Sequence, residues 1–199
     1  MIKTNNILKE DYETYSNKNM KISREKKKGN LIKIVNGVYE TDANVEGYLL
    51  ANSIYGPSYL SFDFALYLYG LIPEKVTTYT SATCEKKKKK TYYNDFGCYT
   101  YRDVPLNVYP LGIKLIENNG YTVQIATPEK ALCDKLYTIS PVKNYKELEQ
   151  LLFEDLRIDI EKFKGLNVSD IEEISNYYHS TNVNFLYRYM RRNSNGYSY

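Results

Sequence analysis

Residues 17–41, NKNMKISREKKKGNLIKIVNGVYET, decide what the N-terminal part of the chain can fold into. The first half predicts a basic helix that ends at Gly29, because glycine readily adopts the left-handed conformation that closes a helix. The second half places Asn36-Gly37 between two short apolar runs, which is the strongest local signal of a tight β-hairpin. We therefore predict a helix followed directly by strands over 31–35 and 38–41.

A cationic helix followed by a two-stranded wing is the outline of a winged helix-turn-helix, whose helix enters the major groove of DNA while the wing lies along the backbone. Such a domain normally has three helices before its wing, and only about thirty residues precede this hairpin. We expect one helix over 5–15, and a second over 44–54 that can complete the domain from downstream. The expected domains are a reduced winged helix-turn-helix over 1–42 and a larger domain over 43–199.

Positive charge is concentrated in the N-terminal region. Residues 1–40 hold nine lysines and arginines against five acids, whereas the remainder of the chain holds 18 against 19. Such a cluster is an electrostatic footprint for phosphate groups, although a solvated helix face gives the same pattern. Arg24 is the best candidate for a guanine contact, since its planar guanidinium matches two acceptors of that base. The candidate DNA-binding residues are Lys18, Lys21, Arg24, Lys26, Lys27, Lys28, Lys33, Asn36 and Gly37.

The rest of the chain predicts a mixed α+β domain with a mainly antiparallel sheet and C-terminal helices. Apolar residues at helical spacing predict a buried helix that ends at Gly70. Segments rich in β-branched residues and tyrosine predict strands over 76–84, 96–104, 108–116 and 121–127. Further helices are expected over 128–139, 144–156, 158–164, 168–178 and 181–192, with frayed residues over 193–199.

The lysine run at 86–90 falls in the connection between the first two of these strands. Its simpler interpretation is a solvated loop that discourages pairing of sheet edges. The alternative is that five adjacent lysines grip a phosphate backbone.

Composition argues for a globular chain without a metal or a cofactor. The sequence has 199 residues, three cysteines at wide spacing and a single histidine, His179. This usage fits a reduced compartment without disulfides, and no close pair of Cys or His ligands indicates a metal site. No apolar run approaches the length of a membrane span, and the N-terminus lacks the apolar core of a signal peptide, so we expect a cytoplasmic protein.

No phosphate-binding glycine loop, nucleophile elbow or paired metal-ligand motif occurs, so we expect no enzymatic activity. His179 has no partner that spacing identifies, and a surface position at a helix end explains it better than catalysis. No cofactor is expected.

Three segments resemble AbiEi-like antitoxins of type IV toxin–antitoxin systems in their order and spacing. They are KKGNLIKIVNGVYET (27–41), YGPSYLSFDFALYLYGLIPE (55–74) and ATPEKALCDKLY (126–137). The linking strand FGCYTYRDVP (96–105) and FEDLRID (153–159) are similar to further motifs of that family, so the resemblance covers about residues 7–190. This chain departs from the family pattern in its short N-terminal region.

The resemblance implies an N-terminal winged helix-turn-helix that binds inverted repeats in double-stranded DNA at its own promoter, as a monomer or dimer. It also implies a C-terminal α+β domain needed for antitoxicity, and a nucleotidyltransferase-like toxin that is counteracted without direct binding. Two other hypotheses stay open: a protein-interaction module acting through its C-terminal domain without operator binding, and an enzyme that modifies RNA or nucleotides.

Overall fold

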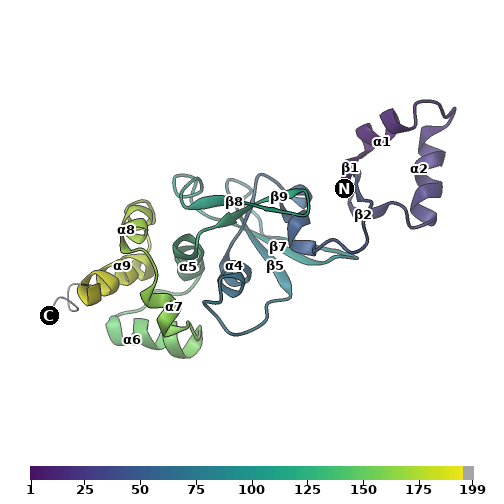
Figure 1. The fold of residues 1–199 in the computed structure, drawn as a ribbon. Helices are drawn as coiled ribbons and strands as arrows, with labels where there is room; N and C mark the ends of the chain where they lie inside the picture. The colour runs from purple at the N-terminus through teal and green to yellow at the C-terminus, as the bar shows by residue number, and fades with distance from the viewer. Residues whose placement is uncertain (195–199) are drawn as a thin grey trace.

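The computed structural model describes residues 1–194 as a mixed α+β chain; residues 195–199, and with them most of the segment expected to be frayed, lie outside the described residues. Figure 1 shows the N-terminal elements as a lobe at one end, the large sheet in the middle and the C-terminal helices at the other end. The N-terminal lobe consists of β1 (Ile2–Thr4), α1 (Asn5–Asp11), α2 (Lys18–Lys27), β2 (Ile32–Val35) and β3 (Val38–Glu40). Its strands form an antiparallel sheet in the order β1-β3-β2.

Local signals explain where the two N-terminal helices begin and end. The Thr4 hydroxyl accepts from the Ile7 amide at 3.4 Å, and the Asn17 side chain accepts from the Met20 amide at 2.9 Å, so each helix has a capped start. Gly29 follows α2 with φ at +79°, which is the conformation that closes a helix. Leu8, Ile22, Leu31 and Tyr39 form a small separate core between the helices and the sheet.

The large sheet is mixed, with strand order β6-β7-β5-β4-β9-β8. Its strands are β4 (Tyr59–Leu60), β5 (Thr78–Thr83), β6 (Lys90–Asn94), β7 (Gly97–Asp103), β8 (Ile113–Asn118) and β9 (Tyr121–Ala126). The β5–β7 and β4–β9 pairs are parallel, and the other neighbours are antiparallel. The sheet is therefore less purely antiparallel than the sequence predicts.

Helical segments cover both faces of this sheet. On one face, the hydroxyls of Tyr99 and Tyr101 donate to backbone carbonyls of Gly47 and Ala51, at 3.0 and 2.7 Å. On the other face, Tyr59 reaches Asp134 on the helix that follows β9. These segments are η1 (Gly47–Leu50), α3 (Ala51–Ile54), α4 (Phe62–Leu68) and α5 (Pro128–Tyr137). The C-terminal group is α6 (Tyr145–Glu149), a π-helical turn η2 (Gln150–Asp155), α7 (Ile160–Lys164), α8 (Val168–Tyr177) and α9 (Thr181–Ser194).

Several sequence-based boundaries are wrong, for identifiable reasons. The helix expected over 44–54 is a 3-10 turn and a single helical turn, and its buried residues belong to the core of the large sheet. The strand expected over 108–116 begins only at Ile113, because residues 106–112 form turns around Pro110. The segment 144–156 changes from α to π geometry at Gln150. Strands β1, β4 and β6 were not predicted, since each is short or begins inside a polar run.

A buried carboxylate joins three elements of the large domain. Asp134 on α5 is fully buried beside Lys130, one helical turn away, at 2.5 Å. Its oxygens also accept hydrogen bonds from Tyr59 at 3.0 Å, Ser61 at 2.6 Å and Tyr178 at 2.5 Å. Burial, followed by the charge of Asp134, raises the pKa of both Tyr59 and Tyr178, so these hydroxyls stay protonated as donors.

We expect Asp134→Ala to lower the free energy of unfolding by about 3–5 kcal/mol, because it leaves the Lys130 ammonium buried without a counter-charge. Lys130→Met combined with Asp134→Leu removes both charges and should restore much of that stability. The matched control is Glu74→Gln, which breaks the exposed ion pair with Arg157 and should cost less than about 1 kcal/mol. Urea unfolding measures all three; an Asp134→Ala variant as stable as the control would contradict this role.

Candidate nucleic-acid interface

Helix α2 presents one face to the small core and the opposite face to solvent. Ile22 and Glu25 are buried, at 6% and 8% exposure. A helix repeats every 3.6 residues, so Met20, Ser23, Arg24 and Lys27 fall on the side opposite Ile22. These side chains are exposed and lie three and four residues apart, which makes them one continuous stripe.

Arg24 and Lys27 are the cations that this stripe offers. The Arg24 guanidinium contacts the Met20 sulfur at 3.4 Å. Among residues 1–193, whose side chains the structure describes, neither Arg24 nor Lys27 has an acidic partner. Both charges are therefore available to an anionic ligand without breaking an existing ion pair.

Three other lysines of the predicted site are engaged within the lobe. Lys21 pairs with Glu25 at 2.8 Å and lies over the rings of Tyr12 and Tyr15, at 5.5 and 4.9 Å. Lys28 approaches the same carboxylate at 3.8 Å. Lys26 lies over the Tyr39 ring at 5.4 Å. These contacts orient the lysines and reduce the charge that they present.

Glu25 is the acidic residue of α2 that Lys21, Lys28 and Asn30 contact. The Lys21 ammonium and the Asn30 amide, at 2.8 and 2.7 Å, donate to it and hold its pKa at about 2, against an opposing effect of desolvation. A lowered carboxyl pKa means that the pair stabilises the lobe fully above the ordinary pKa of about 4.5. The contribution disappears as the pH falls toward 2.

The remaining predicted residues lie apart from the stripe. Lys18 is half-buried beside a polar cavity that Lys9, Glu10 and Glu13 also line, so charges of both signs lie near it. Lys33 and Asn36 are exposed on the hairpin. The Gly37 carbonyl accepts from the Asn5 amide at 2.8 Å, so the hairpin turn packs on the start of α1 and does not project beyond it.

Sequence reasoning missed Asn19 and Ser23, two exposed polar residues on α2. Asparagine is a side chain that can donate to and accept from adenine in the major groove. The signal that could have found Ser23 is helical spacing, because Ser23 lies between Met20 and Lys27 on the outward stripe. Attention to charge alone overlooked it.

The other face of the small sheet holds the lobe to the large domain. Ile34 is buried in the large core, and its carbonyl accepts from the Asn94 side chain at 3.1 Å. Glu40 is fully buried, and its carboxylate accepts from the Met1 α-amino group and the amides of Thr41 and Asp42. These donors outweigh the effect of burial and lower the pKa of Glu40. As Figure 1 shows, α1 and α2 consequently lie on the side turned away from the large sheet.

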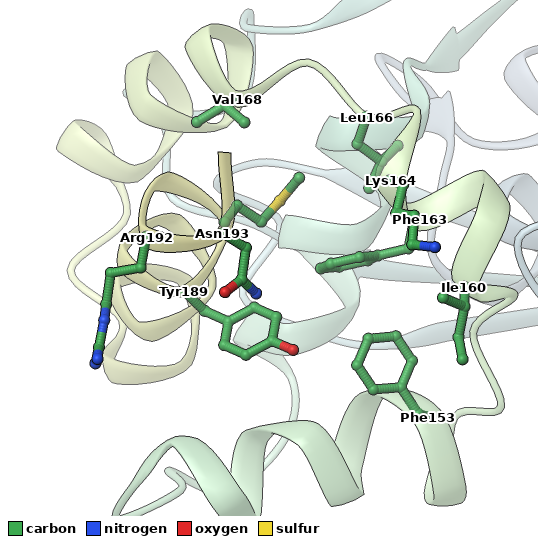
Figure 2. Close-up of a pocket in the computed structure, with 10 residues that line it drawn as sticks. Phe153, Ile160, Phe163, Lys164, Leu166, Val168, Tyr189, Arg192 and Asn193 are labelled. Carbon is green, nitrogen blue, oxygen red and sulfur yellow. The ribbon is translucent and has the colours of Figure 1, made fainter. Parts of the chain in front are cut away.

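A second cavity lies at the opposite end of the described chain, among α7, α8, α9 and the π-helical turn. It measures about 880 Å³, and Figure 2 shows the rings of Phe153, Phe163 and Tyr189 gathered along it. Phe153 and Phe163 meet edge to face at 5.3 Å. The described residues that line it are mainly apolar, with Lys164 and Arg192 as cations. The lining therefore offers mainly apolar contacts.

In the described part of the chain, no group of three or more His, Cys, Asp or Glu side chains is placed to hold a metal ion. None of the described helices is both long and apolar enough to cross a membrane. Cys84, Cys98 and Cys133 carry free thiols, and His179 is exposed. A search of protein-family models found no match for this sequence, and a search of curated proteins found none either.

We expect Lys21→Met to raise the pKa of Glu25 from about 2 toward its ordinary value near 4.5, because it removes the donor with the largest effect. A pH titration of the Glu25 side-chain carbon by NMR measures the change. Lys27→Met is the matched control, since Lys27 lies on the outward stripe, and it should leave that pKa unchanged. Equal pKa values in the two variants would show that Lys21 does not hold Glu25.

Proposed function

We propose that the chain is a non-enzymatic, cytoplasmic antitoxin of the type IV kind that also represses its own operon by binding promoter DNA. The observation that carries the DNA-binding part is the connectivity of the N-terminal lobe. Strand β1, the pair α1 and α2, and the hairpin β2–β3 follow one another, and β1 pairs with β3. This order, two helices followed by a short hairpin, supports the proposal of a reduced winged helix-turn-helix.

In this proposal α2 is the helix that enters the major groove. Its outward stripe supplies Arg24 for guanine and Lys27 for phosphate, while Asn19 and Ser23 supply further polar contacts. The turn over residues 12–17 is longer than the three or four residues usual in this motif. The rings of Tyr12 and Tyr15, 5.9 Å apart, fill that turn.

Lys33 and Asn36 on the short hairpin are proposed as backbone contacts beside α2. The hairpin turn packs on α1, so its reach along DNA is small, and we assign most of the phosphate contacts to α2. Lys18, Lys21, Lys26 and Lys28 then contribute to the positive field, and their ion pairs and ring contacts set their positions.

The antitoxin part rests on the resemblance to the AbiEi-like family and on the domain over 43–199. The motif over 126–137 contains Lys130 and Asp134, which are fully buried, so this stretch supports the fold of that domain. The functional partner in this proposal is a nucleotidyltransferase-like toxin that the antitoxin counteracts without direct binding.

The second candidate is a protein-interaction module that acts through its C-terminal domain without operator binding. The cavity in Figure 2 favours it, because its lining is mainly apolar and its aromatic rings could contact apolar side chains of a partner. It predicts a stable complex when the chain is co-expressed with the product of the neighbouring reading frame. The antitoxin proposal predicts no such complex together with affinity for promoter DNA.

We expect Arg24→Gln combined with Lys27→Gln to weaken binding to duplex DNA from upstream of the chain's own reading frame by about tenfold or more. The dependence of log K on log salt should also become shallower, by about 0.9 for each phosphate that the variant no longer neutralises. Fluorescence anisotropy across a salt series measures both quantities.

The matched control is Lys143→Gln combined with Lys146→Gln, which removes two exposed charges from the large domain. It should bind DNA like the unaltered protein. If the α2 variant and this control keep the same affinity and the same salt slope as the unaltered protein, α2 is not the DNA-reading helix.

A further inference from the structure

Half of one face of the large sheet is left open over strands β6 and β7. Along β7, Tyr99 and Tyr101 are buried on one face, whereas Cys98, Thr100 and Arg102 on the other are only half-buried. On β6, Thr91 and Tyr93 are exposed. Successive residues of a strand point to opposite faces, so these half-buried and exposed residues share the face that carries α4 and α5.

Three threonines form a row across this face. Thr80 on β5 is paired in register with Thr100 on β7, which is paired with Thr91 on β6. Residues opposite one another on neighbouring strands have side chains on the same face and close together. All three line a cavity of about 270 Å³. The Thr80 hydroxyl is used within the fold, donating to the Ser61 carbonyl at 2.6 Å.

Cations surround this row. Arg102 and Lys89 line the same cavity, and Lys135 reaches it from α5, paired with Asp63 at 2.6 Å. Within residues 1–193 the structure gives Arg102 no ion-pair partner, although its side chain is half-buried. A partly desolvated guanidinium beside hydroxyl donors is suited to a phosphate group, which accepts several hydrogen bonds at once.

An exposed aromatic ring stands beside the cavity. Tyr93 is two residues along β6 from Thr91 and therefore on the same face, at a spacing of about 6.6 Å between backbone positions. Its side chain is 79% exposed, whereas the neighbouring Tyr92 is half-buried and contacts Tyr55 and Tyr101 on the other face. Arg102 lies on the other side of the threonine row, because Tyr93 is in register with Cys98 and Thr91 with Thr100. The backbone positions of Tyr93 and Arg102 are therefore about 13 Å apart along the strands, which a single strand can span with successive phosphates.

We propose that this open face binds single-stranded nucleic acid, with a base stacked on Tyr93 and successive phosphates along the threonine row toward Arg102. A single strand fits because a base inside a duplex is stacked on its neighbours and cannot lie on a side chain. The exposed lysines at 87–89 lead into β6 and extend the positive surface along the strand's path. The site is distinct from the outward stripe of α2, so it can be tested independently of the DNA-binding proposal.

A free nucleotide has the same phosphate and base, so the experiment compares both sources. Fluorescence anisotropy with labelled oligouridylate and oligothymidylate, and with a fluorescent mononucleotide, measures binding to the full chain. Tyr93→Ala should weaken oligonucleotide binding by about tenfold or more, since stacking one base on an aromatic side chain has an effect of this size. Tyr93→Phe keeps the ring and should bind like the unaltered protein.

Arg102→Gln tests the phosphate contact and should weaken binding of both kinds of ligand by about tenfold. Arg188→Gln is its matched control, because Arg188 is exposed on α9, far along the chain from the open face. Thr100→Val keeps the shape of the strand and serves as a second variant if Arg102→Gln does not fold. It should reduce affinity by a smaller factor.

The outcomes separate the alternatives. Sensitivity of oligonucleotide binding to Tyr93→Ala, together with full binding in the Arg24→Gln, Lys27→Gln variant, supports the proposal. A mononucleotide bound as tightly as the oligonucleotides, with the same sensitivity, assigns the site to free nucleotides. The proposal would be overturned if inorganic tripolyphosphate or a phosphopeptide bound as tightly as the oligonucleotides and Tyr93→Ala left that binding unchanged. It would also be overturned if the Arg24→Gln, Lys27→Gln variant abolished single-strand binding while the variants on the open face left it unchanged.

Discussion

The large domain depends on the burial of one carboxylate. Asp134 lies on α5, and its hydrogen-bond donors come from α5 itself, from β4 and its flanking residue Ser61, and from the end of α8. An unpaired charge at this depth would be costly, so the position of each donor is restricted by the need to satisfy it. The sheet, α5 and the C-terminal helices are thereby fixed relative to one another, although they come from distant parts of the sequence. The resulting frame holds the open face of β6 and β7 on one side of the sheet.

The N-terminal lobe is attached to this frame through the small sheet, which has buried residues on both faces. Tyr39 faces the small core under α1 and α2, whereas Ile34 and Glu40 face the large domain. Tyr121 of β9 lies beside Glu40, and its pKa is raised to about 12, first by burial and then by that carboxylate. Because the large domain lies on one side of the small sheet and α1 and α2 lie on the other, α2 is left accessible along its outward stripe. The same arrangement therefore attaches the N-terminal lobe to the large domain and leaves α2 accessible.

Structural features that depend on a short stretch of sequence could be predicted, whereas those that depend on contacts between distant residues could not. Asn36-Gly37 and Gly29 act through local backbone preferences, and the structure places a hairpin and a helix end there. The segment 44–54 has the apolar content of a helix, yet Leu49, Leu50 and Ala51 are buried in the large core as a tighter turn. Charge identified the basic residues of α2 but not their partners, since Lys21 is paired with Glu25 through a geometry that composition does not reveal. Strand β1 has only three residues and exists through its pairing with β3, which no local pattern encodes.

We propose that the outward stripe of α2 contacts duplex DNA while the large domain holds the lobe in place. The most direct test is an NMR titration of the isotope-labelled full chain with duplex DNA from upstream of its own reading frame. The account predicts that amide signals of residues 19–28 change most, with Arg24 and Lys27 among them, and that signals of α6 to α9 stay in place. Changes confined to the large domain, or no change on α2 at saturating DNA, would contradict it.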